Sequence, residues 1–230
     1  MDRANNIEAI VFDVLGTMVD EPGSLRTAIR NALPAADDTT IDQLLTVWQN
    51  HVANEQQRIH EGTRPYANSD IIDREAAHHV AARSGLTDPD TIEQLATASQ
   101  RMKPWNDSPT ALASLAAHFP VLALTHASRA CLLRLNAHAG LRWHQALSAE
   151  DAQAYKPAPQ VYQLALNAAQ CPPQHVLMVA AHAWDLRGAQ SHGILTAYIH
   201  RPTGNPPSKT DTFNWHTNNL TELTHALATP

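Results

Sequence analysis

The chain has 230 residues, of which 43% are hydrophobic, and its formal net charge at pH 7 is -6. This length suits one good-sized domain or a core domain with a smaller insert, and the acidic balance argues against nucleic acid as a general partner. Because we find neither a basic start followed by an apolar stretch nor an apolar run of about 18 residues, we expect no signal peptide and no membrane span. Cys131 and Cys171 are the only cysteines and have no CxxC spacing, which indicates a reducing cytoplasm.

A short apolar run near the start of the chain predicts a buried strand. Residues 10–12 are Ile-Val-Phe, and turn residues follow them. Asp13 comes at the end of this strand, with Gly16 and Thr17 directly after it. Ligands of open α/β sheets bind beyond the carboxyl ends of the strands, so Asp13 is well placed for a nucleophile. A turn-capping aspartate is the other interpretation, and this motif alone does not decide between the two.

The next part of the chain has the apolar spacing of helices. Predicted helices cover residues 24–33, 40–60, 70–84 and 90–101. An all-helical block inserted after one strand of an α/β protein is typical of a cap over the active-site end of the sheet. We therefore predict a helical cap domain over residues 21–104 and a core domain made of residues 1–20 and 105–230.

From residue 105 onward, strands and helices alternate. Predicted strands cover residues 121–124, 146–148, 176–180, 195–199 and, weakly, 212–215. Predicted helices cover residues 109–118, 129–139, 159–169, 185–192 and 220–227, and the proline-rich residues 201–209 form a loop. This alternation predicts an α/β fold with a Rossmann-like parallel sheet and the inserted helical cap.

Polar groups follow four of the predicted strands or lie in the loops after them. They are Asp13, the pair Thr125 and His126, Lys156, and Asp185. Each has an ordinary structural interpretation: Thr125 can bond its own turn, and Asp185 can start a helix. Four such groups in order along a parallel sheet are hard to explain by chance, and they predict one site at the carboxyl edge of the sheet.

The four stretches together resemble the haloacid dehalogenase superfamily, and within it the type II 2-haloacid dehalogenase group. The resemblance spans nearly the whole chain and implies the Rossmann-like core with its cap. It is carried by Phe12-Asp-Val-Leu-Gly-Thr17, Leu124-Thr-His-Ala-Ser128, Ala154-Tyr-Lys-Pro-Ala-Pro159 and Met178-Val-Ala-Ala-His-Ala-Trp-Asp185.

The first and last motifs separate two chemistries within the superfamily. Phosphatases of this superfamily have an Asp two positions after the nucleophile, which acts as general acid. This chain has Leu15 at that position, and a leucine side chain transfers no proton. The phosphatases also use a paired acidic motif to help hold Mg²⁺, where this chain has Ala180 and His182. A halide leaving group needs neither a proton nor a metal, so the resemblance implies a dehalogenase without a metal or other cofactor.

The mechanism that the resemblance implies is covalent. Asp13 attacks the carbon that bears the halogen, and water then hydrolyses the ester to release a 2-hydroxy acid. Lys156 would keep Asp13 ionised, Asp185 would pair with Lys156 and help the water, and Thr125 with its turn amides would bind the substrate carboxylate. Gly16 and Thr17 would shape the turn and present amides beside the nucleophile.

Several departures from the group concern the substrate. Gln49 follows Trp48 where an Arg is usual, and His126 and His182 stand where Asn is usual. Arg58 or Arg64 could supply the missing cation, and a solvated arginine beside a loop is the alternative for each. The substrate-binding set that we predict is Leu15, Gly16, Thr17, Gln49, Arg58, Arg64, His126, His182 and Trp184.

Three functional hypotheses stay open at this point. The favoured one is a hydrolase that acts on short 2-haloacids or related carboxylates. The second is a hydrolase of the same covalent design with another substrate, such as a phosphate ester. The third is a catalytically silent cap-and-core scaffold that binds a small ligand or a partner. A homodimer through the cap helices is a further expectation from the resemblance.

Overall fold

The computed structural model describes residues 6–228, and its core is a six-stranded sheet in which every pairing is parallel. The strand order is β3-β2-β1-β4-β5-β6, which places β1 in the middle. The strands are β1 (Ala9–Phe12), β2 (Val121–Thr125), β3 (Gln145–Ser148), β4 (Val176–Ala180), β5 (Leu195–Ile199) and β6 (Trp215–Thr217).

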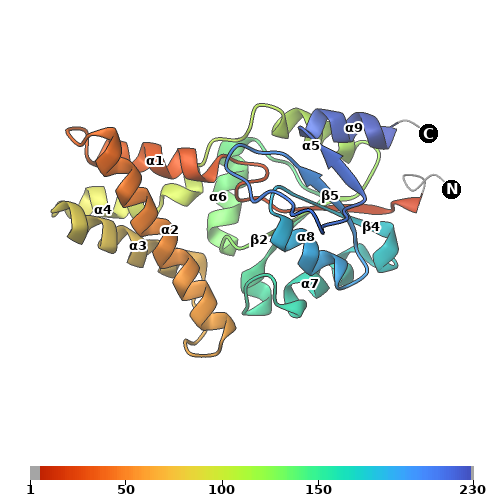
Figure 1. Cartoon of the computed structure of the whole chain (residues 1–230), viewed down its shortest axis with the longest axis horizontal. Coiled ribbons are helices and arrows are strands. Elements are labelled where there is room, and N and C mark those ends of the chain that lie inside the picture. Colours follow the sequence, from red (N-terminus) through yellow and green to blue (C-terminus); the bar gives the residue numbers. More distant parts are fainter. Residues whose placement is uncertain (1–5, 229–230) are drawn as a thin grey trace.

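Between β1 and β2 the chain forms a group of helices that lies to one side of the sheet (Figure 1). This group contains α1 (Glu21–Ala32), α2 (Asp38–His60), α3 (Ser69–Ser84), α4 (Pro89–Ala96) and the 3₁₀ helix η2 (Ala98–Arg101). The other helices are α5 (Ser108–Ala116), α6 (Arg129–Ala139), η3 (Ala149–Ala152), α7 (Pro159–Ala169), η4 (Pro173–His175), α8 (Ala183–Gln190) and α9 (Leu220–Ala228).

The sheet is covered on both faces, because alternate residues of its strands enter two separate apolar clusters. Ile10 and Phe12 of β1 pack with α5 and α9, and Ala9 and Val11 pack with α7 and α8. This alternation is the two-residue period of a strand, and a central parallel strand is apolar on both faces. Figure 1 shows α5 and α9 above the sheet and α7 and α8 below it.

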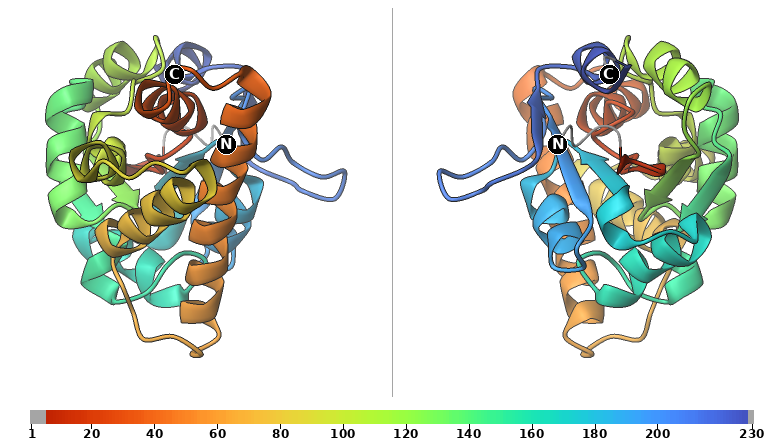
Figure 2. Two further views of the ribbon diagram at one scale, coloured as in Figure 1. Left: turned by 90° about the vertical axis from the view of Figure 1, so that its left-hand side faces the viewer. Right: turned by 90° about the vertical axis from the view of Figure 1, so that its right-hand side faces the viewer.

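The first of these clusters extends into the inserted helices. Leu25 of α1 and Trp48 of α2 belong to the same apolar cluster as Ile10 and Phe12. The inserted helices are therefore packed onto the sheet through a continuous apolar core. The loop between α2 and α3 and the connection between β5 and β6 both project from the body (Figure 2).

The α/β fold with a parallel Rossmann-like sheet is confirmed, while several predicted elements have other bounds in the structure. The predicted helix 90–101 ends at Ala96 and continues as η2, because the Thr97 hydroxyl donates to the Glu93 carbonyl and the backbone leaves the helical conformation there. The weak last strand lies at Trp215–Thr217 rather than 212–215, since the Asn214 side chain accepts the Thr196 amide and strand pairing starts one residue later. The division into domains at residues 20 and 105 stays a prediction.

None of the helices that the structure describes is both long and apolar enough to span a bilayer.

Candidate active site

Asp13 directly follows β1 and is held by the turn that comes after it. The carboxylate is 6% exposed, and its Oδ2 accepts a hydrogen bond from the Thr17 hydroxyl at 2.7 Å. Gly16 has a φ of 76°, and a Cβ there would lie 2.6 Å from Nε2 of His182. Position 16 therefore requires glycine both for its left-handed backbone and for the close approach of the imidazole.

Lys156 lies between two buried carboxylates. Its Nζ is 2.9 Å from Asp13 Oδ1 and 2.6 Å from Asp185 Oδ2. The other oxygen of Asp185 accepts from the Tyr162 hydroxyl at 2.8 Å. A buried charge is tolerated when it is paired and hydrogen-bonded, and every charge in this group has such a partner. The residues after β1, after β3 and after β4 thus meet at the carboxyl edge of the sheet.

The charges in this group determine the protonation state of Asp13. Burial alone would raise the pKa of Asp13, but the Lys156 ammonium, the His182 ring and the Thr17 hydroxyl together bring it below its ordinary value. Burial lowers the pKa of Lys156, and the two carboxylates more than reverse this, so it lies above its ordinary value. Burial raises the pKa of Asp185 above its ordinary value. The negative charge of Asp13 adds to this shift, and the Lys156 ammonium, which the two carboxylates share, opposes it. Asp13 is therefore an ionised carboxylate at neutral pH.

His126 faces the loop that carries Lys156. Its Nε2 accepts a hydrogen bond from the Lys156 backbone N–H at 2.9 Å. Burial and the nearby ammonium lower the pKa of His126 to about 3, so the ring is neutral and carries its proton on Nδ1.

Two backbone amides of the turn after β2 donate to oxygens of the protein. The Ala127 amide donates to the Thr125 hydroxyl at 3.2 Å, and the Ser128 amide donates to the Ser69 hydroxyl of α3 at 2.8 Å. We expected Thr125 and these amides to bind a substrate carboxylate. In this arrangement the Thr125 hydroxyl is buried and the two amides are used to stabilise the turn and join it to α3.

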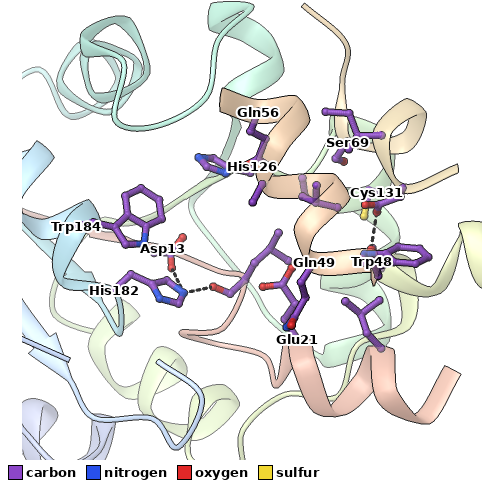
Figure 3. A pocket seen from close by; sticks show the side chains of 18 residues that line it. Asp13, Glu21, Trp48, Gln49, Gln56, Ser69, His126, Cys131, His182 and Trp184 are labelled. Atoms are coloured by element: carbon purple, nitrogen blue, oxygen red, sulfur yellow. Dashed lines mark hydrogen bonds and ion pairs between the residues drawn. The ribbon is translucent and has the colours of Figure 1, made fainter. Parts of the chain in front are cut away.

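A pocket of about 240 Å³ opens beside Asp13 between the sheet and the inserted helices. Figure 3 shows Asp13, His182 and Trp184 on one side of it and Trp48, Gln49 and Glu21 on the other. Of the predicted site residues, the pocket is lined by Asp13, Leu15, Gln49, His126, His182 and Trp184. Five other predicted site residues are not part of this lining, namely Lys156, Asp185, Thr125, Gly16 and Thr17. No lysine or arginine is part of it within the described chain.

Arg58 and Arg64 are both engaged with carboxylates away from the pocket. Arg58 contacts Glu55 at 2.9 Å, and Arg64 bridges Glu55 and Glu75. Neither arginine lines the pocket. The structure therefore does not bring either guanidinium to the place where Gln49 stands.

Two carboxyl groups that the sequence motifs did not identify, those of Glu21 and Asp73, also line the pocket. Burial raises the pKa of Glu21 to about 8 and that of Asp73 to about 7, and the charge of each neighbouring carboxylate adds to the shift. Asp73 accepts from the Ser99 hydroxyl at 2.6 Å. The spacing of Asp73 in the sequence could have indicated its burial, because it shares one helical face with the buried residues 76, 77 and 80.

The residues at this edge do not fit Mg²⁺. A magnesium ion needs several oxygen ligands in near-octahedral geometry. The two carboxylates of the edge, Asp13 and Asp185, both contact the Lys156 ammonium, and the side chains of Leu15 and Ala180 offer no ligand atom. Within the part of the chain that the structure describes, no three His, Cys, Asp or Glu side chains are arranged to hold a metal ion.

Comparison with known proteins identifies the family. The family model of the haloacid dehalogenase-like hydrolases matches residues 7–193, so the chain belongs to this family of hydrolases. It is 30% identical over 203 residues to an (S)-2-haloacid dehalogenase of Pseudomonas sp. strain YL, covering 86% of this chain and 84% of that protein. An (S)-2-haloacid dehalogenase of Pseudomonas putida is 27% identical over 203 residues, with 86% and 87% coverage.

The fold comparison agrees with the sequence comparison. A crystal structure of an L-2-haloacid dehalogenase superposes with a TM-score of 0.88 at 30% identity and covers 97% of this chain and 100% of its own. These matches confirm the resemblance on which the sequence motifs were interpreted.

Proposed function

We propose that the protein is a hydrolytic dehalogenase that acts on short 2-haloacids through a covalent ester on Asp13. The observation that carries this proposal is the pairing of Asp13 with Lys156. The turn that contains Asp13 has Leu15 at the position of the general acid. Such a site has a nucleophile kept ionised but no acid for a leaving oxygen, which fits displacement of a halide. Relatives named (S)-2-haloacid dehalogenase support the substrate class.

In the first step, a carboxylate oxygen of Asp13 attacks C2 of the substrate. The new C–O bond forms as the C–X bond breaks, and the bonding electron pair leaves with the halide. Lys156 contacts Asp13 Oδ1 and Thr17 contacts Oδ2, so both oxygens are oriented before attack. His182, whose Nε2 is 3.8 Å from Asp13 Oδ2, lies beside the reacting carboxylate.

In the second step, water attacks the Asp13 carbonyl carbon and the bond to the substrate oxygen breaks. The products are the 2-hydroxy acid and the regenerated Asp13 carboxylate, and one proton is released to solvent. Asp185 would position the water through the Lys156 ammonium rather than by direct contact, because it is fully buried and does not line the pocket. It is a positioning residue in this account.

Uncharged groups would meet the substrate carboxylate. The Nδ1–H of His126 and the amide of Gln49 are donors of pocket-lining side chains, and Gly16 and Thr17 shape the turn beside them. Thr125, predicted to bind the substrate carboxylate, would instead support this wall from behind, because its hydroxyl is buried and accepts the Ala127 amide. The two free cysteines favour the cytoplasm as compartment, and a homodimer stays a prediction.

The proposal is tested by halide release from a panel of 2-haloacids in EDTA. Native protein should release halide without added metal, and Asp13→Asn should lose at least about 10⁴-fold in kcat because the nucleophile is gone. Asp90→Asn, an exposed aspartate of α4, is the matched control and should keep full activity. Hydrolysis of an aryl phosphate with Mg²⁺, in place of halide release, would contradict the proposal.

A further inference from the structure

The carbonyl groups of the nucleophile turn are held by side chains from distant parts of the chain. Trp105 Nε1–H donates to the Gly16 carbonyl at 3.1 Å, and Arg201 Nε–H donates to the Thr17 carbonyl at 3.0 Å. The two donors are distant in the sequence, since Trp105 lies just before α5 and Arg201 just after β5. The turn is thus restrained at consecutive peptide groups.

Arg201 is a buried cation, and its position is closely defined. The residue is 7% exposed, and its Nη2 lies 2.8 Å from Asp107 Oδ1. Its guanidinium carbon lies 5.4 Å from the centre of the Trp105 ring. Loss of these partners would leave a buried guanidinium unpaired and would destabilise the folded protein. Arg201 and Trp105 therefore form one packed unit.

This unit is linked to Asp13 through Thr17. The Thr17 hydroxyl donates to Asp13 Oδ2 at 2.7 Å and accepts from the Ala181 amide at 2.9 Å. Moving the Thr17 backbone would move this hydroxyl and remove one of the two contacts that orient the nucleophile. Neither Arg201 nor Trp105 lines the pocket, so any effect on chemistry passes through the turn.

We propose that Arg201 and Trp105 are positioning residues that hold the Asp13 turn, so that the Thr17 hydroxyl stays on the nucleophile. The proposal rests on the dehalogenase function proposed above and adds two residues to it. Displacement of a reacting group by about 1 Å can cost about 10²-fold in rate. Losing the restraint should therefore lower kcat and leave KM nearly unchanged.

The matched pair Arg201→Met and Asp107→Asn separates positioning from simple structural support. Both variants break the buried ion pair, but only the first removes the donor to the Thr17 carbonyl. We expect kcat to fall about 30- to 100-fold in Arg201→Met and less than about threefold in Asp107→Asn, with KM within about twofold in both.

Trp105→Phe provides a milder variant in case Arg201→Met folds poorly. It keeps a smaller aromatic ring beside Arg201 and removes the N–H that donates to Gly16. A fall in kcat of about three- to tenfold at nearly native Tm is expected. Native kcat in this variant would overturn the role of Trp105.

A titration of the Asp13 carboxyl by ¹³C NMR gives a readout that needs no substrate. Loss of the Thr17 hydrogen bond should raise the pKa of Asp13 in Arg201→Met and leave it unchanged in Asp107→Asn. The proposal would be overturned if both variants lost kcat equally, in step with their loss of Tm, and if Asp13 titrated in the same way in both. If native protein releases no halide, the dehalogenase function fails, and the titration still decides whether Arg201 positions Asp13.

Discussion

The two sides of the pocket differ in how their charges are arranged. On the sheet side, Asp13, Lys156 and Asp185 form a closed group in which each charge contacts an opposite one. On the side of the inserted helices, Glu21 and Asp73 are carboxyl groups with raised pKa values, and the described part of the chain places no lysine or arginine in the pocket lining beside them.

This difference separates chemistry from recognition. The sheet side contains what a covalent displacement requires, namely an ionised and oriented carboxylate. The helical side offers a wall that includes Gln49 and the two acids. The negative charge of Glu21 and Asp73, once they are ionised, opposes an anionic substrate. The reaction type therefore follows from one side, and the substrate preference depends on the other.

Removing the cation of the sheet side should have the largest effect. Lys156→Met leaves Asp13 and Asp185 buried without a counter-charge, so the free energy of unfolding should fall by about 3–5 kcal/mol and kcat by about 10³-fold. Lys209→Met, which changes an exposed loop lysine, is the control for both denaturation and halide release. Near-native stability of Lys156→Met would contradict the closed charge group.

Adding a cation to the helical side should sharpen recognition. Gln49→Arg places a guanidinium on the pocket wall, and KM for 2-chloropropionate should fall about tenfold while kcat changes little. Asn50→Arg, at the exposed neighbouring position that does not line the pocket, should leave KM unchanged. The same decrease in both variants would indicate general electrostatic attraction rather than a contact in the pocket.

The pH dependence of KM should show the acids of the helical side. Glu21 and Asp73, with pKa values of about 8 and about 7, are protonated below these values and charged above them. Rising pH therefore adds negative charge to the pocket, and KM for a 2-haloacid should increase about three- to fivefold between about pH 7 and pH 9. Glu21→Gln should remove most of this increase, whereas Glu61→Gln, an exposed control, should retain it.

Local signals in the sequence were sufficient for the sheet and for the place of Asp13 at its carboxyl edge. The apolar run before Asp13 and the alternation after residue 105 predict a central strand and a parallel sheet, because both depend on short-range patterns. The ends of elements were less predictable, as the break at Thr97 and the late start of β6 show.

The residues that the sequence did not indicate act through long-range contacts. Arg201 reaches the Thr17 carbonyl across 184 positions, and Trp105 reaches Gly16 across 89, which no local pattern encodes. Arg64 is a case that the sequence left open between a pocket cation and a surface arginine, and the fold pairs it with Glu55 and Glu75. Asp73, in contrast, could have been found as a carboxylate on an apolar helix face.

The most direct test of the central claim is the mass of the peptide that contains Asp13 after rapid quenching with 2-chloropropionate. The covalent account predicts that, within one turnover, this peptide becomes heavier by the substrate without its halogen, and that fragmentation places the added mass on Asp13. The modification should be absent in Asp13→Asn. Halide release by native protein with an unmodified Asp13 at every quench time would contradict the account, because water would then attack the substrate directly.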